Sequence, residues 1–265
     1  MHVVTNYPDG VFSWVDLTTT DAEAAKTFYS ELFNWEAEDL PTGMGGVYTM
    51  FRIDGKNVAG MGAMSPEMQA QGIPPYWTSY VKHDDVDAVA QKAPEAGGTV
   101  MVEPFDVMEE GRMAIIQDPT DAVFGVWQPH NHTGAQLINT VNALSWNELQ
   151  TRDVDAAQAF YGDVFGWTYE ADPSGYVTVL QAEGRQAGMM QLDERMADVP
   201  PNWSIYFMVD DAEATAAKAE ELGGRVLVPP SPAGDVGTFS VLQDPQGAVF
   251  SVIRFDNPTS PPSSA

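Results

Sequence analysis

Two short segments of this chain each carry a tryptophan and an acidic residue two positions apart. Trp14 precedes Asp16, and Trp146 precedes Glu148 in the same way. Apolar residues alternate around both pairs, which predicts β-strands, and side chains two apart in a strand point to the same face. A carboxylate beside an indole ring can hold an organic cation through charge and cation–π contact. If burial against the ring raises its pKa, the same carboxylate can act as a general base.

Other residue types that carry chemistry are scarce. The chain has no cysteine, which excludes thiol nucleophiles, disulfides and thiolate metal sites. Its four histidines are His2, His83, His130 and His132. The last two stand two apart in a polar stretch, where two ligands on a loop rarely suffice to hold a metal. Neither a nucleophile elbow nor a phosphate or dinucleotide loop is present.

The two Trp–acid pairs belong to a duplication of the whole chain. Landmarks in residues 10–128 recur in residues 142–254, first at an offset of 132 and later at an offset of 126. A slowly drifting offset with retained landmarks indicates two similar domains with small differences in their loops. The landmark pairs are Trp14 and Trp146, Phe28-Tyr29 and Phe160-Tyr161, Trp35 and Trp167, Trp77 and Trp203, Gly97-Gly98 and Gly223-Gly224, and Asp118-Pro119 and Asp244-Pro245.

Periodicity and turn residues predict the elements of each repeat. Asp21 and Asp85 are expected to cap helices, Gly97-Gly98 to end the second helix, and residues 118–121 to form a hairpin turn. The second repeat has the same pattern, so the chain is predicted to contain four βαβββ units. In the first repeat strands are expected at 10–18, 46–53, 57–64, 76–82, 99–106, 112–117 and 122–128, and helices at 22–33 and 86–96.

These elements define the predicted domain organisation. The first domain spans residues 8–129, a polar linker 130–141, the second domain 142–256, and a Pro/Ser-rich flexible tail 257–265. A chain that is 44% hydrophobic can bury two cores. Because four units in one chain can satisfy their pairing internally, a monomer is expected, with a dimer as the alternative.

Charge and composition narrow the partners and the location. The formal net charge is −26, from 38 acidic and 12 basic residues. This excess argues against nucleic acid and against an anionic membrane surface as partners, since both require clustered lysine and arginine. No apolar stretch approaches the length of a membrane span, and the N-terminus does not resemble a signal peptide. The expected location is the cytoplasm.

Paired βαβββ units with these capping and turn residues resemble the vicinal oxygen chelate superfamily, which includes glyoxalase I, bleomycin-resistance proteins and extradiol dioxygenases. The likeness covers about residues 10–255 and is closest to two-domain actinobacterial proteins labelled glyoxalase-like or hydroxylase. The resemblance implies an α+β fold in which each domain pairs two units into a half-open barrel with the ligand in its cup. The motifs that carry it are Thr20-Asp21 before Phe28-Tyr29, Asp153 before Phe160-Tyr161, Asp84-Asp85 and Asp210-Asp211 before Gly-Gly, and Asp118-Pro119 and Asp244-Pro245.

The resemblance also implies a divalent metal held by His, Gln or carboxylate side chains, and this chain departs from that pattern. Counting from the capping aspartates aligns the four ligand positions of each domain with side chains that are neither His nor carboxylate. The expectation is therefore a metal-free protein without a cofactor. The aligned positions are Trp14, Thr78, Gly125 and one residue in 58–64, and then Trp146, Ser204, Ser251 and one residue in 186–192.

What remains in each expected cup is an aromatic and polar lining. Asp16 and Glu148 are the candidate catalytic bases, although either could be a structurally satisfied buried acid, and the tryptophans could be core filler. Aromatic walls with a few polar groups suit a small-molecule pocket. The candidate ligand-binding residues are Trp14, Thr78, Tyr80 and Trp127 in the first cup, and Trp146, Ser204, Tyr206 and Ser251 in the second.

Two functions from different classes follow. The favoured one is a metal-free binding module, similar to the drug-sequestering branch of the family, for an aromatic or cationic small molecule. The alternative is a glyoxalase-like lyase or an oxygenase-type enzyme that uses an Asp or Glu base or an unrecognised metal site. A third is a structural or surface-recognition module whose pockets are filled.

Overall fold

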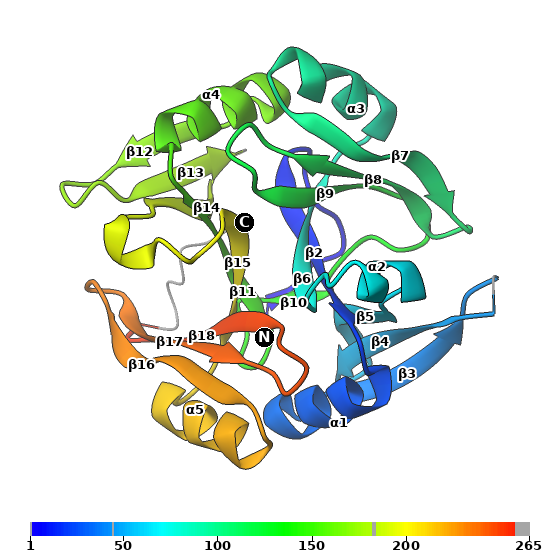
Figure 1. Cartoon of the computed structure of the whole chain (residues 1–265), viewed down its shortest axis with the longest axis vertical. Coiled ribbons are helices and arrows are strands. Elements are labelled where there is room, and N and C mark those ends of the chain that lie inside the picture. The colour runs from blue at the N-terminus through cyan, green and yellow to red at the C-terminus, as the bar shows by residue number, and fades with distance from the viewer. Residues whose placement is uncertain (1, 44, 182–183, 258–265) are drawn as a thin grey trace.

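The computed structural model describes residues 2–43, 45–181 and 184–257 and shows an α+β protein with two eight-stranded mixed sheets, one for each repeat (Figure 1). The predicted fold class is confirmed. The tail predicted for 257–265 lies outside the described residues except for Asn257. Within the described ranges, no helix is long and apolar enough to cross a membrane.

Each repeat supplies the strands of one sheet. The first contains β2 (Val11–Thr19), α1 (Ala22–Phe33), β3 (Glu36–Pro41), β4 (Val47–Ile53), β5 (Lys56–Ala63), α2 (Pro66–Ala70), β6 (Tyr76–Lys82), α3 (Val86–Glu95), β7 (Thr99–Val107), β8 (Gly111–Gln117) and β9 (Val123–Pro129). The second contains β11 (Leu144–Thr151), α4 (Val154–Phe165), β12 (Thr168–Ala171), β13 (Val177–Gln181), β14 (Gly184–Gln191), the 3-10 helix Glu194–Met196, β15 (Asn202–Met208), α5 (Ala212–Glu221), β16 (Arg225–Ala233), β17 (Gly237–Gln243) and β18 (Val249–Phe255).

The strand order shows how two units make one sheet. The first sheet runs β3-β4-β5-β2-β6-β9-β8-β7, and the second runs β12-β13-β14-β11-β15-β18-β17-β16. The opening strands of the two units, β2 and β6, pair antiparallel at the centre, and each pairs parallel with the last strand of its own unit, β5 or β9. The second sheet repeats this arrangement, which is the predicted set of four βαβββ units.

The helices begin where the capping aspartates predicted. The side chains of Asp21, Asp85, Asp153 and Asp211 each accept a hydrogen bond from the backbone N–H three residues later. These bonds satisfy donors that have no partner inside the first helical turn. Gly97 ends the second helix with φ +91, in the left-handed region that glycine adopts without strain.

Sequence periodicity missed one edge strand of each sheet. β3 and β12 are mostly exposed and polar, so they lack the apolar alternation that marks a half-buried strand. The polar linker predicted over 130–141 is part of the packed structure. Leu137–Ile138 forms β10, pairs antiparallel with β1 (His2–Val3), and is buried together with Ala135.

The two largest hydrophobic cores are each shared between the repeats. In Figure 1, α1 lies beside α5, and α3 lies beside α4 on the opposite side of the molecule. One core joins side chains of α1, β4 and β5 to side chains of β15, α5 and β18, and the other joins α3, β8 and β9 to α4, β13 and β14. Helices of the first and fourth units therefore bury their apolar faces together, as do those of the second and third.

Buried tyrosines link the repeats across these cores. The Tyr29 hydroxyl donates to Asp244 Oδ2 at 2.9 Å and accepts from the Trp77 indole N–H at 3.1 Å. Tyr161 makes the equivalent bonds with Asp118 and Trp203, at 2.9 and 2.7 Å. Asp118 and Asp244 thus each also accept a hydrogen bond from a tyrosine hydroxyl of the other repeat.

Candidate functional site

The strand β2 divides its side chains between a core face and a concave face. Val15 and Leu17 are fully buried in the shared core, whereas Asp16 and Thr18 on the opposite face stay partly exposed. In β6, Ser79 and Val81 are fully buried, and Thr78 and Tyr80 on the opposite face are each 6% exposed. We call the concave face of the first sheet the first cup and that of the second sheet the second cup.

In the first cup, Asp16 is held by two tyrosines. Tyr48 on β4 donates its hydroxyl to Asp16 Oδ2 at 3.2 Å, and Tyr80 on β6 lies 3.2 and 3.3 Å from the two carboxylate oxygens. The indole N–H of Trp14 donates to the Tyr48 hydroxyl at 3.0 Å. A chain of hydrogen bonds therefore runs from the tryptophan through a tyrosine to the carboxylate.

The second cup repeats this cluster around Glu148. Tyr176 and Tyr206 donate their hydroxyls to Glu148 Oε2 and Oε1 at 3.0 and 2.9 Å. The Trp146 indole N–H donates to the Tyr176 hydroxyl at 3.0 Å, and the Gln150 amide adds a bond of 3.3 Å to the carboxylate. An Asp in one cup and a Glu in the other thus occupy equivalent positions.

Sequence reasoning did not select Tyr48 and Tyr176, and two glycines explain how they reach the carboxylates. Gly60 pairs with Asp16, and a Cβ on Gly60 would lie 1.9 Å from the Tyr48 hydroxyl oxygen. A Cβ on Gly188 would lie 1.8 Å from that of Tyr176. The signal in the sequence is a tyrosine followed twelve residues later by a glycine in both repeats.

The remaining predicted residues also line the cups. Thr78 pairs with Asp16, and Trp127 on β9 packs in one cluster with Trp14 and Tyr80. In the second cup, Ser204 pairs with Glu148, and its hydroxyl lies 3.5 Å from that of Ser251. The structure therefore brings all ten predicted residues to two concave faces, five on each.

One residue in the first cup comes from the segment between the repeats. The ring of His132 stands edge-on to Trp14, with centroids 4.4 Å apart, and the Trp127 indole N–H donates to the His132 carbonyl at 2.8 Å. Neither contact could be predicted from local sequence, because both depend on the path of the chain after β9.

Burial perturbs the carboxylates. It raises the pKa of Asp16 to about 6, while the hydrogen bonds from Tyr48 and Tyr80 oppose that rise. It also raises the pKa of Glu148, against the hydrogen bonds from Tyr206, Gln150 and Tyr176. In the described part of the chain, the ion pairs of lysine and arginine involve other carboxylates. When Asp16 and Glu148 are ionised, their carboxylates are therefore stabilised by neutral hydrogen-bond donors.

These side chains do not fit the metal site that the fold family implies. The first cup offers one carboxylate and the imidazole of His132 among phenol, indole and hydroxyl groups, and the second cup offers one carboxylate. Divalent ions are held by several His, Cys, Asp or Glu ligands. Residues 2–43, 45–181 and 184–257 contain no group of three or more such side chains that could hold a metal. In the expected ligand segment 58–64, Gly60 lies against the hydroxyl of Tyr48.

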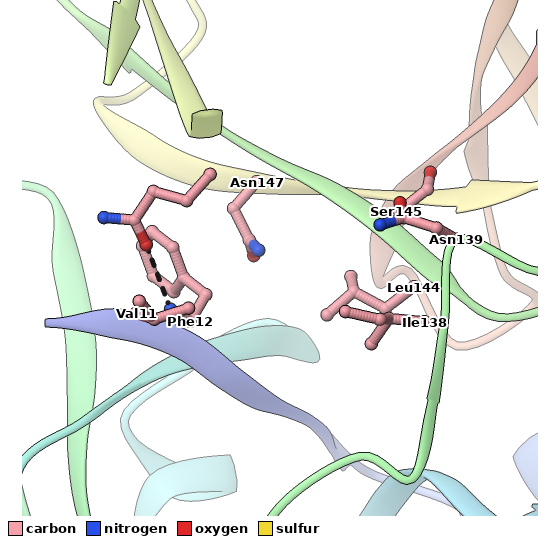
Figure 2. A pocket seen from close by; sticks show the side chains of 8 residues that line it. Val11, Phe12, Ile138, Asn139, Leu144, Ser145 and Asn147 are labelled. Carbon is pink, nitrogen blue, oxygen red and sulfur yellow. Dashed lines mark hydrogen bonds between the residues drawn. The ribbon is translucent and has the colours of Figure 1, made fainter. Parts of the chain in front are cut away.

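A small cavity lies between the repeats (Figure 2). Its polar walls serve the contact between the two repeats: Gln186 accepts from the backbone N–H of Phe12 and donates to the carbonyl of Gly10, and Asn147 accepts from Ser79. These hydrogen bonds hold the two sheets together around the cavity. The two cups therefore remain the candidate sites. Its lining residues are Val11, Phe12, Ile138, Asn139, Leu144, Ser145, Asn147 and Gln186.

Asp16→Asn is expected to stabilise the ligand-free protein more at pH 8 than at pH 5. With a folded pKa of about 6 against 3.8, folded Asp16 binds its proton more tightly than the unfolded chain. The free energy of unfolding of the wild type therefore falls as the pH rises from about 3.8 to about 6, and this loss of stability persists above pH 6. The variant should gain about 1 kcal/mol relative to wild type between the two pH values.

Urea unfolding followed by tryptophan fluorescence at both pH values measures this difference. Asp54→Asn is the matched control, because it removes the same charge from an exposed turn. A gain that is the same at pH 5 and pH 8 would contradict a buried, uncompensated Asp16 carboxylate.

Comparison with known proteins identifies the class. The chain belongs to the glyoxalase/bleomycin resistance protein/dioxygenase superfamily, whose model matches residues 11–125, and a glyoxalase-like domain model matches residues 147–253. Among its relatives is "Putative glyoxylase CFP32" of Mycobacterium tuberculosis, 46% identical over 253 residues, 94% of this chain and 96% of that protein. "Anthracycline biosynthesis protein DnrV" of Streptomyces peucetius is 34% identical over 268 residues, 95% of each chain.

Solved structures share the fold. A Mn(II)-bound glyoxalase from Novosphingobium aromaticivorans matches with a TM-score of 0.63 and 17% identity, covering 93% of this chain and 82% of that chain. The 2,3-dioxygenase LapB from Pseudomonas sp. KL28 matches with a TM-score of 0.64 and 12% identity, covering 93% of each. At these identities the likeness shows the fold alone.

Proposed function

We propose that this chain is a glyoxalase-like small-molecule-binding protein whose cups hold an aromatic or cationic organic ligand without a metal. The observation that carries the proposal is the carboxylate of each cup, enclosed by tyrosine hydroxyls and unpaired with lysine or arginine in the described residues. An ionised carboxylate in such a place is stabilised by a cation that enters beside it.

The walls favour a cation carried on an aromatic body. Trp14 and Trp146 stand next to the carboxylates, and Tyr80 and Tyr206 close the other side. Indole and phenol faces attract an organic cation and stack on planar rings. Two of the relatives are named for anthracycline biosynthesis, and anthracyclines are planar aromatic compounds, so the names agree with this class of ligand.

Calorimetric titration with tryptamine and tryptophol tests the proposal, because the two molecules differ in an ammonium against a hydroxyl group. Tryptamine is expected to bind at least about tenfold more tightly, from a charge-assisted contact of about 1.5–3 kcal/mol. Affinity should fall below pH 6, where Asp16 takes up its proton, and addition of EDTA should leave it unchanged. Equal binding of both compounds, or binding that requires a divalent ion, would rule out this function.

Variants of each cup locate the site. Glu148→Gln and Asp16→Asn remove one carboxylate each, and each is expected to weaken tryptamine binding in its own cup. Gly60→Ala keeps the Asp16 carboxylate but forces the Tyr48 hydroxyl away from it. A ligand that contacts the assembled cluster should be weakened by both Asp16→Asn and Gly60→Ala, whereas Asp54→Asn should have no effect.

The raised pKa of Asp16 favours one alternative, a metal-free proton-transfer enzyme of the glyoxalase-like lyase type. A base with a pKa of about 6 is largely ionised at neutral pH and still takes up a proton readily. The assay is isomerisation of a thiol adduct of an α-oxoaldehyde in the presence of EDTA. Turnover that disappears in Asp16→Asn while the fold is retained would establish this enzyme activity, and a metal requirement would exclude it.

A further inference from the structure

The two cups differ at the tryptophan that stands beside the carboxylate. Trp14 is only 3% exposed: the ring of His132 packs edge-on against it, and Trp14 also belongs to a buried cluster with Tyr7 and Ala135. Trp146, at the equivalent position of the second cup, stays partly exposed. The indole of Trp146 is therefore the more accessible of the two, whereas the indole of Trp14 is covered.

The cover in the first cup is anchored by residues that the second repeat lacks. The Trp127 indole N–H donates to the His132 carbonyl at 2.8 Å, and the His132 backbone N–H donates to the Glu110 carbonyl at 3.1 Å. At an offset of 126 residues, Trp127 corresponds to Ile253, whose side chain has no donor. His132 itself corresponds to Pro258, which has no aromatic ring and lies outside the described residues.

The cover can also be displaced. His132 Nε2 is buried without a hydrogen-bond partner, and leaving a buried polar atom unpaired costs free energy. Burial lowers the pKa of His132 to about 4, so the ring is neutral near pH 7 and carries no charge that would compete with a cationic ligand. The cover is thus held by ring packing and by its backbone bonds.

We propose that His132 sets the ligand specificity of the first cup. It restricts that cup to a compact cation at Asp16, while the second cup accepts an aromatic ring against Trp146. This inference rests on the proposed binding function for its consequence, but the covering of Trp14 can be measured without any ligand.

Hydroxyl-radical footprinting of the ligand-free protein, read by residue-resolved mass spectrometry, tests the cover. Trp146 is expected to be oxidised severalfold faster than Trp14, and His132→Ala should raise the rate at Trp14 towards that of Trp146. His130→Ala is the matched control, because His130 is exposed two residues away. His132→Phe keeps a ring in place and should preserve the protection. Equal rates in wild type, or an unchanged Trp14 in a folded His132→Ala protein, would overturn the inference.

Titration with tryptamine then separates the inference from the function on which it rests. Wild type should bind one equivalent tightly, lost in Glu148→Gln, and a second much more weakly, lost in Asp16→Asn. His132→Ala should tighten the weak site towards the affinity of the tight one. Two equivalent sites in wild type would overturn the role of His132 while the binding function stands. Absence of binding in both proteins, together with the expected footprint, would overturn the function and leave His132 as a structural cover.

Discussion

Residues 1–129 produced alone are expected to lack a stable monomeric fold. In the intact chain, Phe28, Tyr29 and Phe33 of α1 pack against Phe207 and Phe250 of the second repeat. Each large side chain left in water forfeits about 1.5–3 kcal/mol. The loss over one shared core is comparable with the net stability of a whole domain, about 5–15 kcal/mol.

Size-exclusion chromatography and urea unfolding of this fragment check the expectation. The fragment should be unfolded or self-associated, because a second copy offers a surface similar to that of the missing repeat. Adding a fragment of residues 130–257 should restore tryptophan fluorescence and cooperative unfolding. A monomeric 1–129 fragment that unfolds cooperatively near the stability of the full chain would contradict the shared cores.

Asp244→Ala is expected to destabilise the protein by about 3–5 kcal/mol, through the loss of buried partners. Asp244 Oδ1 accepts from the backbone N–H groups of Gln246, Gly247 and Ala248, and Oδ2 accepts from Tyr29. Alanine leaves the buried Ala248 N–H without this acceptor and Tyr29 without its carboxylate partner, and it removes the acceptor of the partly buried turn N–H groups.

Two milder variants separate the turn from the contact between repeats. Asp244→Asn keeps an oxygen for the turn and should cost less than alanine. Tyr29→Phe leaves the turn bonds in place and removes the inter-repeat bond to Asp244 and the bond from Trp77, at about 1 kcal/mol for each bond. Free energies of unfolding from urea titrations give the comparison. If Asp244→Ala cost no more than Tyr29→Phe, the carboxylate would not be organising the turn.

Much of the fold could be predicted because its signals are local. The capping aspartates, the apolar face of α1 and the alternation in β2 all depend on neighbours a few residues away. The repeated landmarks were recognised for the same reason. The structural role of these landmarks, which is to pack one repeat against the other, was not predicted. Periodicity shows that a face is buried and does not show what buries it.

Gly98 and Phe160 illustrate this limit. The sequence predicted a glycine pair that ends a helix, and it showed Phe160 only as a landmark repeated from Phe28. In the structure, a Cβ on Gly98 would lie 2.6 Å from the Phe160 ring of the other repeat. The second glycine therefore admits a ring from a helix about sixty residues away, which no local pattern encodes.

Part of the candidate site could likewise be predicted from the sequence, and part could not. Trp14 and Asp16 could be assigned to one face because they lie two residues apart in one predicted strand. Tyr80 could be assigned to the same face because it lies on the opening strand of the next unit. Tyr48 depends on a register between β4 and β5, and His132 on the path of an inter-repeat segment. Both were therefore visible only in three dimensions.

The crosswise cores have a consequence for synthesis of the chain. Tyr29 and Asp244 are separated by 215 positions, so the contact order of this core is high. At ribosomal rates of about 5–20 residues per second, α1 waits about 10–40 s for its partner strand to emerge. During that interval its aromatic face is exposed or held by provisional contacts. Completion of the native core is thus a late, post-translational step, and the nascent first repeat is the form most open to chaperone capture or to pairing with a neighbouring nascent chain.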